Sequence, residues 1–393
     1  MNDSPPGAAD SASRLETVAQ LRAQLNDVLA EAETLWNASP PLHPAARRSF
    51  ANRAAISFRG HLTMDPAEGY ALLRDRFAAL GYTPVLHSQD GYEIVTALPI
   101  VFQAVGNERW WINLILFVMT VGTTTLVGAF LEQGGFSLEI LMRFLREPLL
   151  ILKGIPASLT IMGILGIHEL AHYIAARSHG LDSSLPYFIP IPFGLVGTMG
   201  AIIRMRKPFE NRNSLFDVGA AGPLAGILVA LPLFFVGLMV SEALPPQPEG
   251  MPLGTPLLLR WMEELVYVLR DIPQEYEIYV NSWTFTAWFA VFVSGLNLLP
   301  IGQLDGGHVA YAVLGSRTRI VSTVVLGIIS ILGVLLWPGW YVWMTFIFMS
   351  GWLHPPPLNT LEPLSKGRKI LGIVVFVLMV LLFTPTPFPG MRV

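Results

Sequence analysis

Residues 155–176 read IPASLTIMGILGIHELAHYIAA, an apolar run with the motif H-E-x-x-H near its end. The motif residues are His168, Glu169 and His172. A polar or metal-binding side chain at membrane depth is costly, so one retained there points to a functional site. Residues four apart share a helix face, so both histidines can bind one metal ion, while Glu169 can take a proton from a metal-bound water. The alternative, that the three residues cap or line a buried helix, leaves them uncompensated in an apolar segment.

A second motif supplies a third candidate ligand. Residues 297–308 read NLLPIGQLDGGH and follow another apolar run. Pro300 and Gly302 should interrupt the helix, which is tolerated at membrane depth where the backbone lines a cavity, and the break would aim the Asp305 carboxylate inward. Two imidazoles, one carboxylate and one water make a catalytic zinc site. Asp305 can alternatively be read as the N-cap of a helix starting near Gly307, which does not exclude ligation.

Together the two motifs resemble those of the site-2 proteases, zinc metalloproteases that cut peptide bonds within membranes. That family carries H-E-x-x-H on one transmembrane helix and N-x-x-P-x-x-x-L-D-G on a later one, and both motifs are complete here. The resemblance implies that His168, His172 and Asp305 bind one Zn2+ ion and that Glu169 is the general base.

The second motif also holds candidate residues beyond the ligands. By the resemblance, Asn297 and Pro300 are candidate substrate-binding residues, with Asn297 holding the substrate backbone or the developing oxyanion. Asn297 can alternatively be a helix-breaking residue that only satisfies freed backbone groups. His308 is expected to contact the ligands from behind or to pack in its helix, rather than to bind the metal directly. Of the other histidines, His179 is expected in a turn and His354 at the membrane interface.

The segment between the motifs, residues 186–206, is rich in Gly, Pro and β-branched residues. This composition argues against a helix and for a re-entrant strand hairpin near the membrane. Such a hairpin could bind an unfolded substrate as an added strand, with Gly197 and Gly200 as candidate substrate-binding positions. The alternative is a purely structural re-entrant loop.

Two further segments extend the resemblance. Residues 219–226, GAAGPLAG, are similar to the family's small-residue G-P segment, and small residues let helices approach closely in lipid. Some family members have Asn near its end, where this chain has Gly226, so no side-chain role carries over. The soluble stretch 58–99 resembles that of the cyanobacterial and plastid homologues called ethylene-dependent gravitropism-deficient and yellow-green. Those carry G-N-L-R-G where this chain has Gly60-His-Leu-Thr-Met; the likeness covers about residues 55–385.

Composition independently indicates a membrane protein. The chain is 52% hydrophobic and 13% charged, whereas soluble domains average about 25% charged residues. The net charge of −3 suggests neither nucleic acid nor an acidic partner. Since there is no cysteine, disulfides, thiolate zinc sites and a cysteine nucleophile are excluded, and any metal must rest on His and carboxylate ligands.

The expected fold is a polytopic α-helical membrane protein of about seven spans, between six and eight, with the re-entrant strand hairpin and a small α/β soluble N-terminal domain. The candidate spans lie near 111–131, 155–177, 216–240, 282–300, 319–337, 339–353 and 369–385. The stretch 134–152 is apolar but carries four charged residues, so an interfacial helix is expected there.

The placement of Lys and Arg predicts the orientation. Basic residues gather in the loops 204–212, 317–319 and 366–369, which fall on one side together with the first 100 residues. Since the opposite loop, 241–281, is acid-rich, the basic side should be cytoplasmic. Basic residues at 143–153 are a modest exception. The expected location is a bacterial inner (plasma) membrane, with the N-terminus in the cytoplasm.

Four parts are expected along the chain: a disordered tail at 1–14, an amphipathic helix and Pro linker at 15–44, a small soluble α/β domain at 45–105, and a membrane-embedded zinc protease domain at 110–387. The helix has apolar positions at heptad spacing up to residue 35, which fits a short coiled coil or docking on the next domain. Residues 55–98 read as strand, helix, strand, turn and strand. This small domain is expected to select substrates or to regulate the enzyme; the alternative is that it is only a structural cap.

The expected function is an intramembrane zinc metalloendopeptidase that hydrolyses peptide bonds of transmembrane protein substrates with a zinc-activated water. The alternatives are a catalytically inactive membrane scaffold or a metal transporter that uses the same His/Asp site. A transporter should spread acids and histidines over several helices, whereas here they concentrate at two motifs. A prenyl-protein type membrane zincin needs a downstream glutamate ligand, which no later apolar run carries convincingly. The expected partners are transmembrane substrates and the lipid bilayer, without nucleic acid.

Overall fold

The computed structural model describes residues 8–35, 55–102, 109–247 and 252–389, and their contacts form two compact units. The first, here the sheet unit, combines the N-terminal part of the chain with Lys207–Leu215 and Pro355–Ser365. The second, here the helical unit, contains the remaining described residues from 109 onward. Each unit is described separately below.

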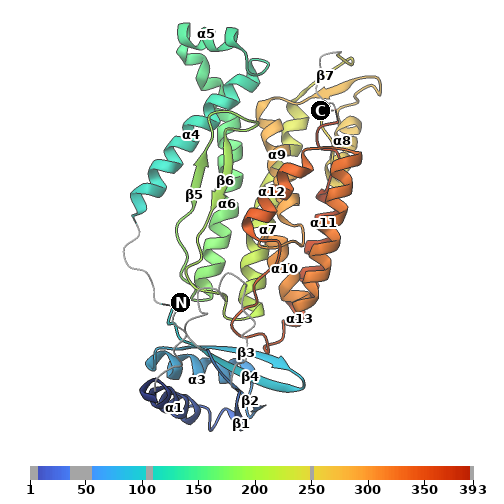
Figure 1. The fold of residues 1–393 in the computed structure, drawn as a ribbon. Coiled ribbons are helices and arrows are strands. Elements are labelled where there is room, and N and C mark those ends of the chain that lie inside the picture. Colours follow the sequence, from blue (N-terminus) through green and yellow to red (C-terminus); the bar gives the residue numbers. More distant parts are fainter. Residues whose placement is uncertain (1–7, 36–54, 103–108, 248–251, 390–393) are drawn as a thin grey trace. The chain divides into compact units, whose positions relative to one another are not determined.

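The sheet unit is built on four antiparallel strands in the order β1-β2-β4-β3, with two helices (Figure 1). Its elements are α1 (Ala8–Ala23), β1 (Leu29–Leu35), β2 (Ile56–Leu62), α3 (Pro66–Ala79), β3 (Thr83–Gln89) and β4 (Tyr92–Leu98). The Asp65 side chain caps α3 by accepting a hydrogen bond from the Ala67 N–H at 2.9 Å, and Pro66 takes the first turn. Large apolar side chains of both helices and the sheet, including Leu21, Leu73 and Phe58, are fully buried in one core.

The predicted order of strand, helix, strand, turn and strand over residues 55–98 is confirmed. Asp90 and Gly91 both have positive φ, 53° and 83°, as a two-residue type I′ hairpin turn requires. The expected helix through position 35 is wrong beyond Ala23, because β1 pairs with β2 instead. The heptad-spaced side chains of Val18, Leu21, Leu25 and Val28 are still buried, but in one core with the sheet, which fits the docking alternative and not a coiled coil. The expected disordered tail is also contradicted from Ala8 on, where α1 begins; the Pro linker and residues 1–7 lie outside the described residues.

Two segments expected in the membrane domain complete the sheet unit instead. The Leu86 N–H of β3 donates to the Leu358 carbonyl at 2.7 Å, and the Asn359 N–H donates to the Glu210 carbonyl at 2.7 Å. The pairing of Asn359 is parallel both to Leu86 and to Asn211. The open edge of β3 is thereby covered by residues 358–360 and then by residues 209–211, which leaves fewer unpaired backbone groups.

Among the described residues, four segments are long and apolar enough to cross a membrane: Trp110–Glu132 (α4), Pro148–Ser178 (a 3-10 turn and α6, Ile155–Ser178), Arg212–Val240 (α7) and Asp305–Leu335 (α10, Asp305–Leu314, and α11, Thr318–Leu335). All of them belong to the helical unit except the first residues of α7, up to Leu215. Three other expected spans form the shorter helices α9 (Ser282–Asn297), α12 (Trp340–Ser350) and α13 (Lys366–Leu382). The chain is therefore a membrane protein with a small sheet domain, and the count of about seven spans stays a prediction. Two more helices are α5 (Leu138–Arg146) and α8 (Leu257–Leu269), and α5 lies in the stretch where an interfacial helix is expected. The short strands β7 (Glu242–Leu244) and β8 (Glu277–Tyr279) pair antiparallel.

Small and hydroxyl side chains bring α4 and α6 close together. A Cβ added at Gly154 would lie 1.9 Å from the Thr125 carbonyl oxygen, so only glycine allows this approach. Deeper in the contact, the buried Thr124 and Ser158 hydroxyls lie 2.6 Å apart. This is how helices pack in lipid, where small residues and interhelical hydrogen bonds replace a hydrophobic driving force.

The predicted hairpin and helix break are both confirmed. Strands β5 (Tyr187–Pro190) and β6 (Thr198–Ile202) pair antiparallel and lie between α4 and α6 (Figure 1). The helix α9 ends at Asn297, and α10 begins at Asp305 after a loop that contains Pro300. The break brings the start of α10 to the face of α6 that carries the histidines.

We predict that Asn359→Ala loosens the covered edge of the sheet unit. The Asn359 side chain is fully buried and donates to the half-buried Pro66 carbonyl at 3.0 Å, so its loss leaves that acceptor without this partner. The expected cost is about 1–3 kcal/mol of local stability. Hydrogen exchange of β3 amides in the full chain should become faster, whereas the exposed β3 variant Ser88→Ala should leave it unchanged; equal exchange in both would contradict the role of Asn359.

Candidate metal centre and cavity

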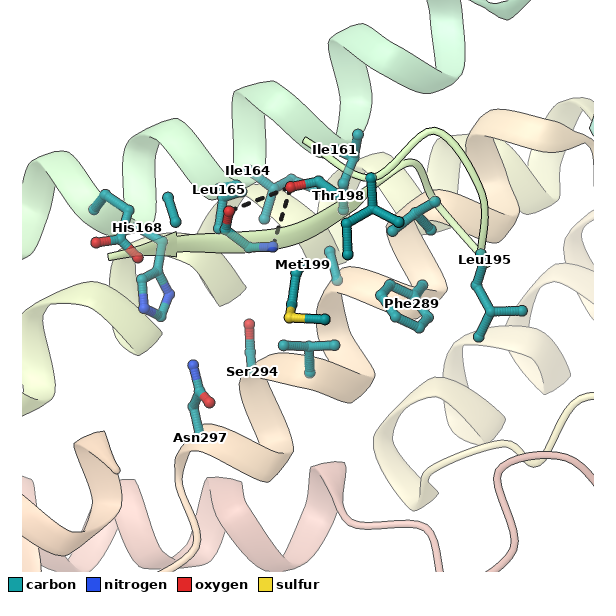
Figure 2. A pocket seen from close by; sticks show the side chains of 18 of the residues that line it. Ile161, Ile164, Leu165, His168, Leu195, Thr198, Met199, Phe289, Ser294 and Asn297 are labelled. Carbon is teal, nitrogen blue, oxygen red and sulfur yellow. Dashed lines mark hydrogen bonds between the residues drawn. The ribbon is translucent and has the colours of Figure 1, made fainter. Parts of the chain in front are cut away.

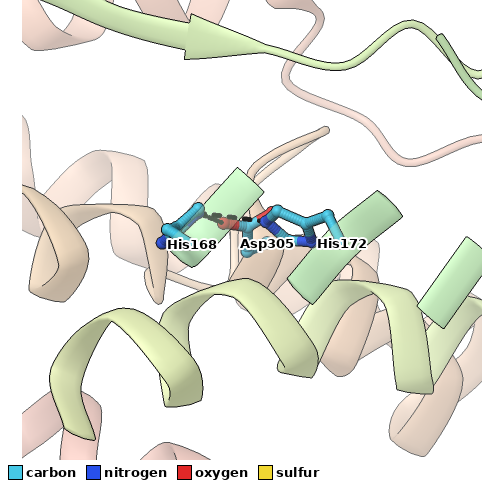
Figure 3. A group of neighbouring side chains, drawn as sticks. All are labelled: His168, His172 and Asp305. Atoms are coloured by element: carbon cyan, nitrogen blue, oxygen red, sulfur yellow. Dashed lines mark hydrogen bonds and ion pairs between the residues drawn. The ribbon is translucent and has the colours of Figure 1, made fainter. Parts of the chain in front are cut away.

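One helical turn of α6 places His168 and His172 side by side. Both are 6% exposed, and their Nε2 atoms lie 3.0 Å apart. Figure 3 shows the two rings turned toward the same point, with the Asp305 carboxylate between them. The i, i+4 spacing of the sequence motif therefore places both imidazoles on one face of α6, as helix geometry predicts.

Asp305 completes the group from a different helix. Its Oδ2 lies 3.4 Å from His168 Nε2, and its Oδ1 lies 3.4 Å from His172 Nε2. It is the first residue of α10, whose N-cap is Leu304, so the N-cap alternative for Asp305 is wrong. The three potential ligand atoms lie within 4.8 Å of one another.

This donor set fits zinc. Zinc binds His nitrogen and carboxylate oxygen at ~2.0–2.2 Å, so tetrahedral ligand atoms lie ~3.3 Å apart. The observed separations of 3.0 and 3.4 Å agree with that spacing before any adjustment of the side chains. Three protein ligands also leave one position open, as in catalytic rather than structural zinc sites.

The His172 ring is oriented by the backbone of α7. Its Nδ1 lies 2.7 Å from the carbonyl oxygen of Val218. Since a carbonyl can only accept, Nδ1 carries the proton, and the Nε2 lone pair is directed at the metal position. Pro223 further along α7 has no N–H for the Gly219 carbonyl, which loosens the helical hydrogen bonding in this part of α7.

Three glycines of α7 form the surface on which the histidines pack. A Cβ at Gly222 would lie 2.1 Å from His172 Nε2, and one at Gly226 would lie 3.2 Å from His168 Nδ1. A Cβ at Gly219 would lie 2.6 Å from His308 Cβ. Sequence reasoning treated this segment as a helix contact and missed its contact with the ligands. The signal was present in the spacing, because glycines three and four residues apart fall on one helix face.

A cavity of about 450 Å³ opens beside the metal position. Figure 2 shows His168 of α6 facing Ser294 and Asn297 of α9 across this space, with Met199 of β6 to one side of them. Glu169, which is 6% exposed, also lines it. Most of the remaining lining is apolar: Ile161, Ile164, Leu165, Val196, Phe289, Val293, Trp343 and Phe346.

Two polar side chains of α4 attach the hairpin to the helices. The Asn113 amide donates to the Leu185 and Pro186 carbonyls at 3.0 and 2.9 Å, just before β5. The Thr123 hydroxyl donates to the Gly197 carbonyl at 2.7 Å, just before β6. Gly197 has φ +81°, and a Cβ there would lie 2.6 Å from the Thr123 carbonyl oxygen, so this contact needs glycine.

The candidate substrate-binding residues therefore divide into two pairs. Asn297 and Gly200 line the cavity. Gly197 instead packs on α4, and the Pro300 carbonyl accepts a hydrogen bond from the Ser322 hydroxyl at 2.9 Å, so among the described residues neither belongs to the cavity lining. Gly197 and Pro300 thus support the site rather than form its wall.

The other histidines occupy two further positions. His308 is outside the three-residue group, and its Nδ1 lies 2.7 Å from His354 Nε2. His179 ends α6 in a turn, as predicted. Its Nε2 also lies 2.7 Å from the Asp217 carboxylate, a pairing that sequence reasoning missed.

Comparison with known proteins agrees with this geometry. Residues 156–337, which include both motifs, match the model of the family described as Peptidase family M50. A protein of Oryza sativa subsp. indica named "Probable zinc metalloprotease EGY2, chloroplastic" is 28% identical over 352 residues, which cover 85% of this chain and 62% of that relative. The Arabidopsis thaliana protein of the same name is 31% identical over 246 residues (61% and 43%), and Arabidopsis thaliana "Probable zinc metalloprotease EGY1, chloroplastic" is 26% identical over 297 residues (70% and 53%). The chain spans less than two thirds of the length of each of these relatives.

We predict that Gly222→Ala removes metal binding. A methyl group 2.1 Å from His172 Nε2 must displace either the imidazole or α7, and either movement separates the ligands. Bound zinc, measured by atomic absorption on the purified protein, should fall to near zero. The matched control is Gly166→Ala on α6, where an added Cβ meets nothing within 4 Å; full zinc content in Gly222→Ala would show that α7 does not confine the site.

Proposed function

Because this chain belongs to the site-2 protease family, peptidase family M50, in the branch of the EGY zinc metalloproteases, we propose that it is an intramembrane zinc metalloendopeptidase that hydrolyses peptide bonds of transmembrane protein substrates. One observation carries the proposal: His168, His172 and Asp305 converge within an apolar helical unit, next to a buried Glu169 and a cavity. The scaffold and transporter alternatives are not favoured, since neither needs a buried general base beside the ligands.

The metal would be held by the Nε2 atoms of His168 and His172 and by the Asp305 carboxylate. When bound there, zinc supplies Lewis-acid chemistry that polarises a scissile carbonyl and acidifies water. The protein's own part is to hold the three ligand atoms at the right spacing. The Val218 carbonyl does this for His172 by fixing its tautomer and ring direction.

Glu169 moves the proton in this proposal. Its carboxylate takes a proton from the attacking water and passes it to the leaving amine nitrogen. It lies on the same helical turn as His168 and lines the same cavity. The Asn297 side chain, which faces this cavity from α9 (Figure 2), can donate a hydrogen bond to the substrate carbonyl as negative charge develops on its oxygen.

The substrate would enter as an extended strand beside β6. A transmembrane helix must unwind before its peptide bonds can be cut, and strand addition replaces the backbone hydrogen bonds that are lost. Met199 and Gly200 of β6 line the cavity, whose apolar walls suit the side chains of a membrane segment. In this scheme Gly197 anchors the hairpin, Pro300 maintains the helix break, and His308 packs behind the ligands.

We further propose that α9, α12 and α13 complete about seven crossings, that the membrane-embedded protease domain occupies 110–387, and that the sheet unit selects substrates or regulates access. The basic loops support an N-terminus on the cytoplasmic side of a bacterial inner membrane. The plant relatives carry the word chloroplastic in their names, so they do not support that particular membrane.

Glu169→Gln is expected to abolish cleavage while zinc and folding are retained. Glutamine keeps the size of the side chain but cannot take up a proton, so turnover should fall by about 10²–10⁴-fold. The measurement is hydrolysis of a transmembrane model substrate by the purified protein in detergent, with zinc content measured in parallel. The comparison variant Asp305→Asn should instead lower bound zinc; undiminished turnover by Glu169→Gln would refute the proposed mechanism.

Thr123→Val is expected to weaken substrate binding without affecting zinc. The substitution keeps the side-chain shape but removes the hydrogen bond to the Gly197 carbonyl, which frees the hairpin to move relative to α4. KM should rise several-fold with kcat largely retained, and Thr123→Ser should restore it. The control is Thr323→Val, whose exposed hydroxyl bonds only within its own helix; an unchanged KM in Thr123→Val would separate the hairpin from substrate binding.

A further inference from the structure

Asp217 of α7 joins three helices through one carboxylate. His179, the C-cap residue directly after α6, has its Nε2 2.7 Å from Asp217 Oδ2. Arg368, in the first turn of α13, donates from Nε to Oδ1 at 2.7 Å and from Nη2 to Oδ2 at 2.5 Å. The side chains are only 25–31% exposed. A bidentate, largely shielded ion pair of this kind holds its partners more firmly than a surface salt bridge.

The residue after Asp217 is the one that orients a metal ligand. Val218 supplies the carbonyl at 2.7 Å from His172 Nδ1. Consecutive residues in a helix are separated by only ~1.5 Å of rise, so Asp217 and the Val218 carbonyl move together as α7 rotates or slides. The contacts of Asp217 with His179 and Arg368 therefore act on the position of that carbonyl.

Helix α7 can move only slightly without disturbing its contact with the His172 ring. Gly222 lies one turn further along α7, and its Cα hydrogens face the His172 ring so closely that a methyl group would overlap Nε2. A rotation of α7 in one direction would press it onto the imidazole, and a rotation in the other would lengthen the bond from Nδ1 to the Val218 carbonyl. Contacts that fix the position of α7 therefore also fix the position of the His172 ring.

We propose that Asp217 is a positioning residue of the metal centre. Held by His179 and Arg368, it fixes the rotation and height of α7 against α6, so that the Val218 carbonyl keeps the His172 lone pair directed at the metal. The proposal rests on the proposed function, because it assumes that His168, His172 and Asp305 bind zinc. It assigns a function to two charged residues and a histidine outside both sequence motifs.

The chain offers a matched control at the same end of α6. Asp182 also contacts two cations, Arg177 at 3.7 Å and Arg206 at 3.4 Å, and its side chain is 18% exposed. Its partners lie on α6 and on the segment after β6, and none of them belongs to α7. Asp182→Asn therefore removes a comparable charge without acting on the Val218 carbonyl.

The test compares zinc affinity in Asp217→Asn and Asp182→Asn, using the full-length protein in detergent and competition with a chelator. Loss of a residue that supports a ligand typically costs about 10–100-fold in metal affinity, and we expect a loss in that range for Asp217→Asn and none for Asp182→Asn. The visible absorption spectrum of the cobalt(II)-substituted protein should change in Asp217→Asn and stay the same in Asp182→Asn. A variant that is only less stable, but is still folded in the sample, would keep the original spectrum.

A double-mutant cycle provides the decisive comparison. Arg368→Gln alone should weaken zinc binding, and adding it to Asp217→Asn should cause no further loss, because both changes break the same contact. Should Asp217→Asn fail to fold, His179→Gln, which removes only one partner, carries the test. Equal zinc affinity and an unchanged cobalt spectrum in Asp217→Asn or in His179→Gln would overturn the inference, whereas absence of zinc binding by the unmutated protein would instead overturn the proposed function.

Discussion

The helical unit depends on one constraint: two imidazoles and the Glu169 carboxylate are buried in an apolar bundle, the Asp305 carboxylate is only 16% exposed, and each group must have a partner there. His168, His172 and Asp305 solve this by pointing their potential ligand atoms at a shared position, where a divalent cation would offset the cost of burying them. Other features of the unit serve that convergence. The break after α9 lets Asp305 begin a helix at the required place, and α7 supplies a carbonyl for the remaining His172 nitrogen.

Glycine is the second requirement, because the metal centre must fit between closely packed helices. On α7 the glycines leave room for imidazole rings, and at Gly154 the missing side chain lets α6 approach α4. In water such glycines would weaken a helix, but in lipid the interhelical contact that they permit is a main source of association. The small-residue segment therefore both holds the helices together and shapes the site.

In the proposed function, the hairpin and the cavity connect the metal centre to a peptide substrate. β5 packs on α4, while β6 turns Met199 and Gly200 toward the cavity shared with α6 and α9. Asn113 and Thr123 attach both ends of the hairpin to α4 through hydrogen bonds to backbone carbonyls. These bonds hold β6 beside the buried Glu169 and the proposed metal position, as the proposed binding of an extended substrate requires.

The sequence by itself determined the features that arise from local pattern. The two motifs named the three residues that converge and the proposed base, Pro300 predicted the break before Asp305, and residues 55–98 predicted the order of strands, helix and turn in the sheet unit, because these signals depend on neighbours a few residues away. Only the tertiary structure decided the contacts made across many residues. The Val218 carbonyl is 46 residues from His172 and could belong to any amino acid, and Asp217 meets His179 from 38 residues away. For the same reason Leu29–Leu35, helical by its apolar spacing, became a strand: pairing with β2 outweighed a local preference that carries little free energy.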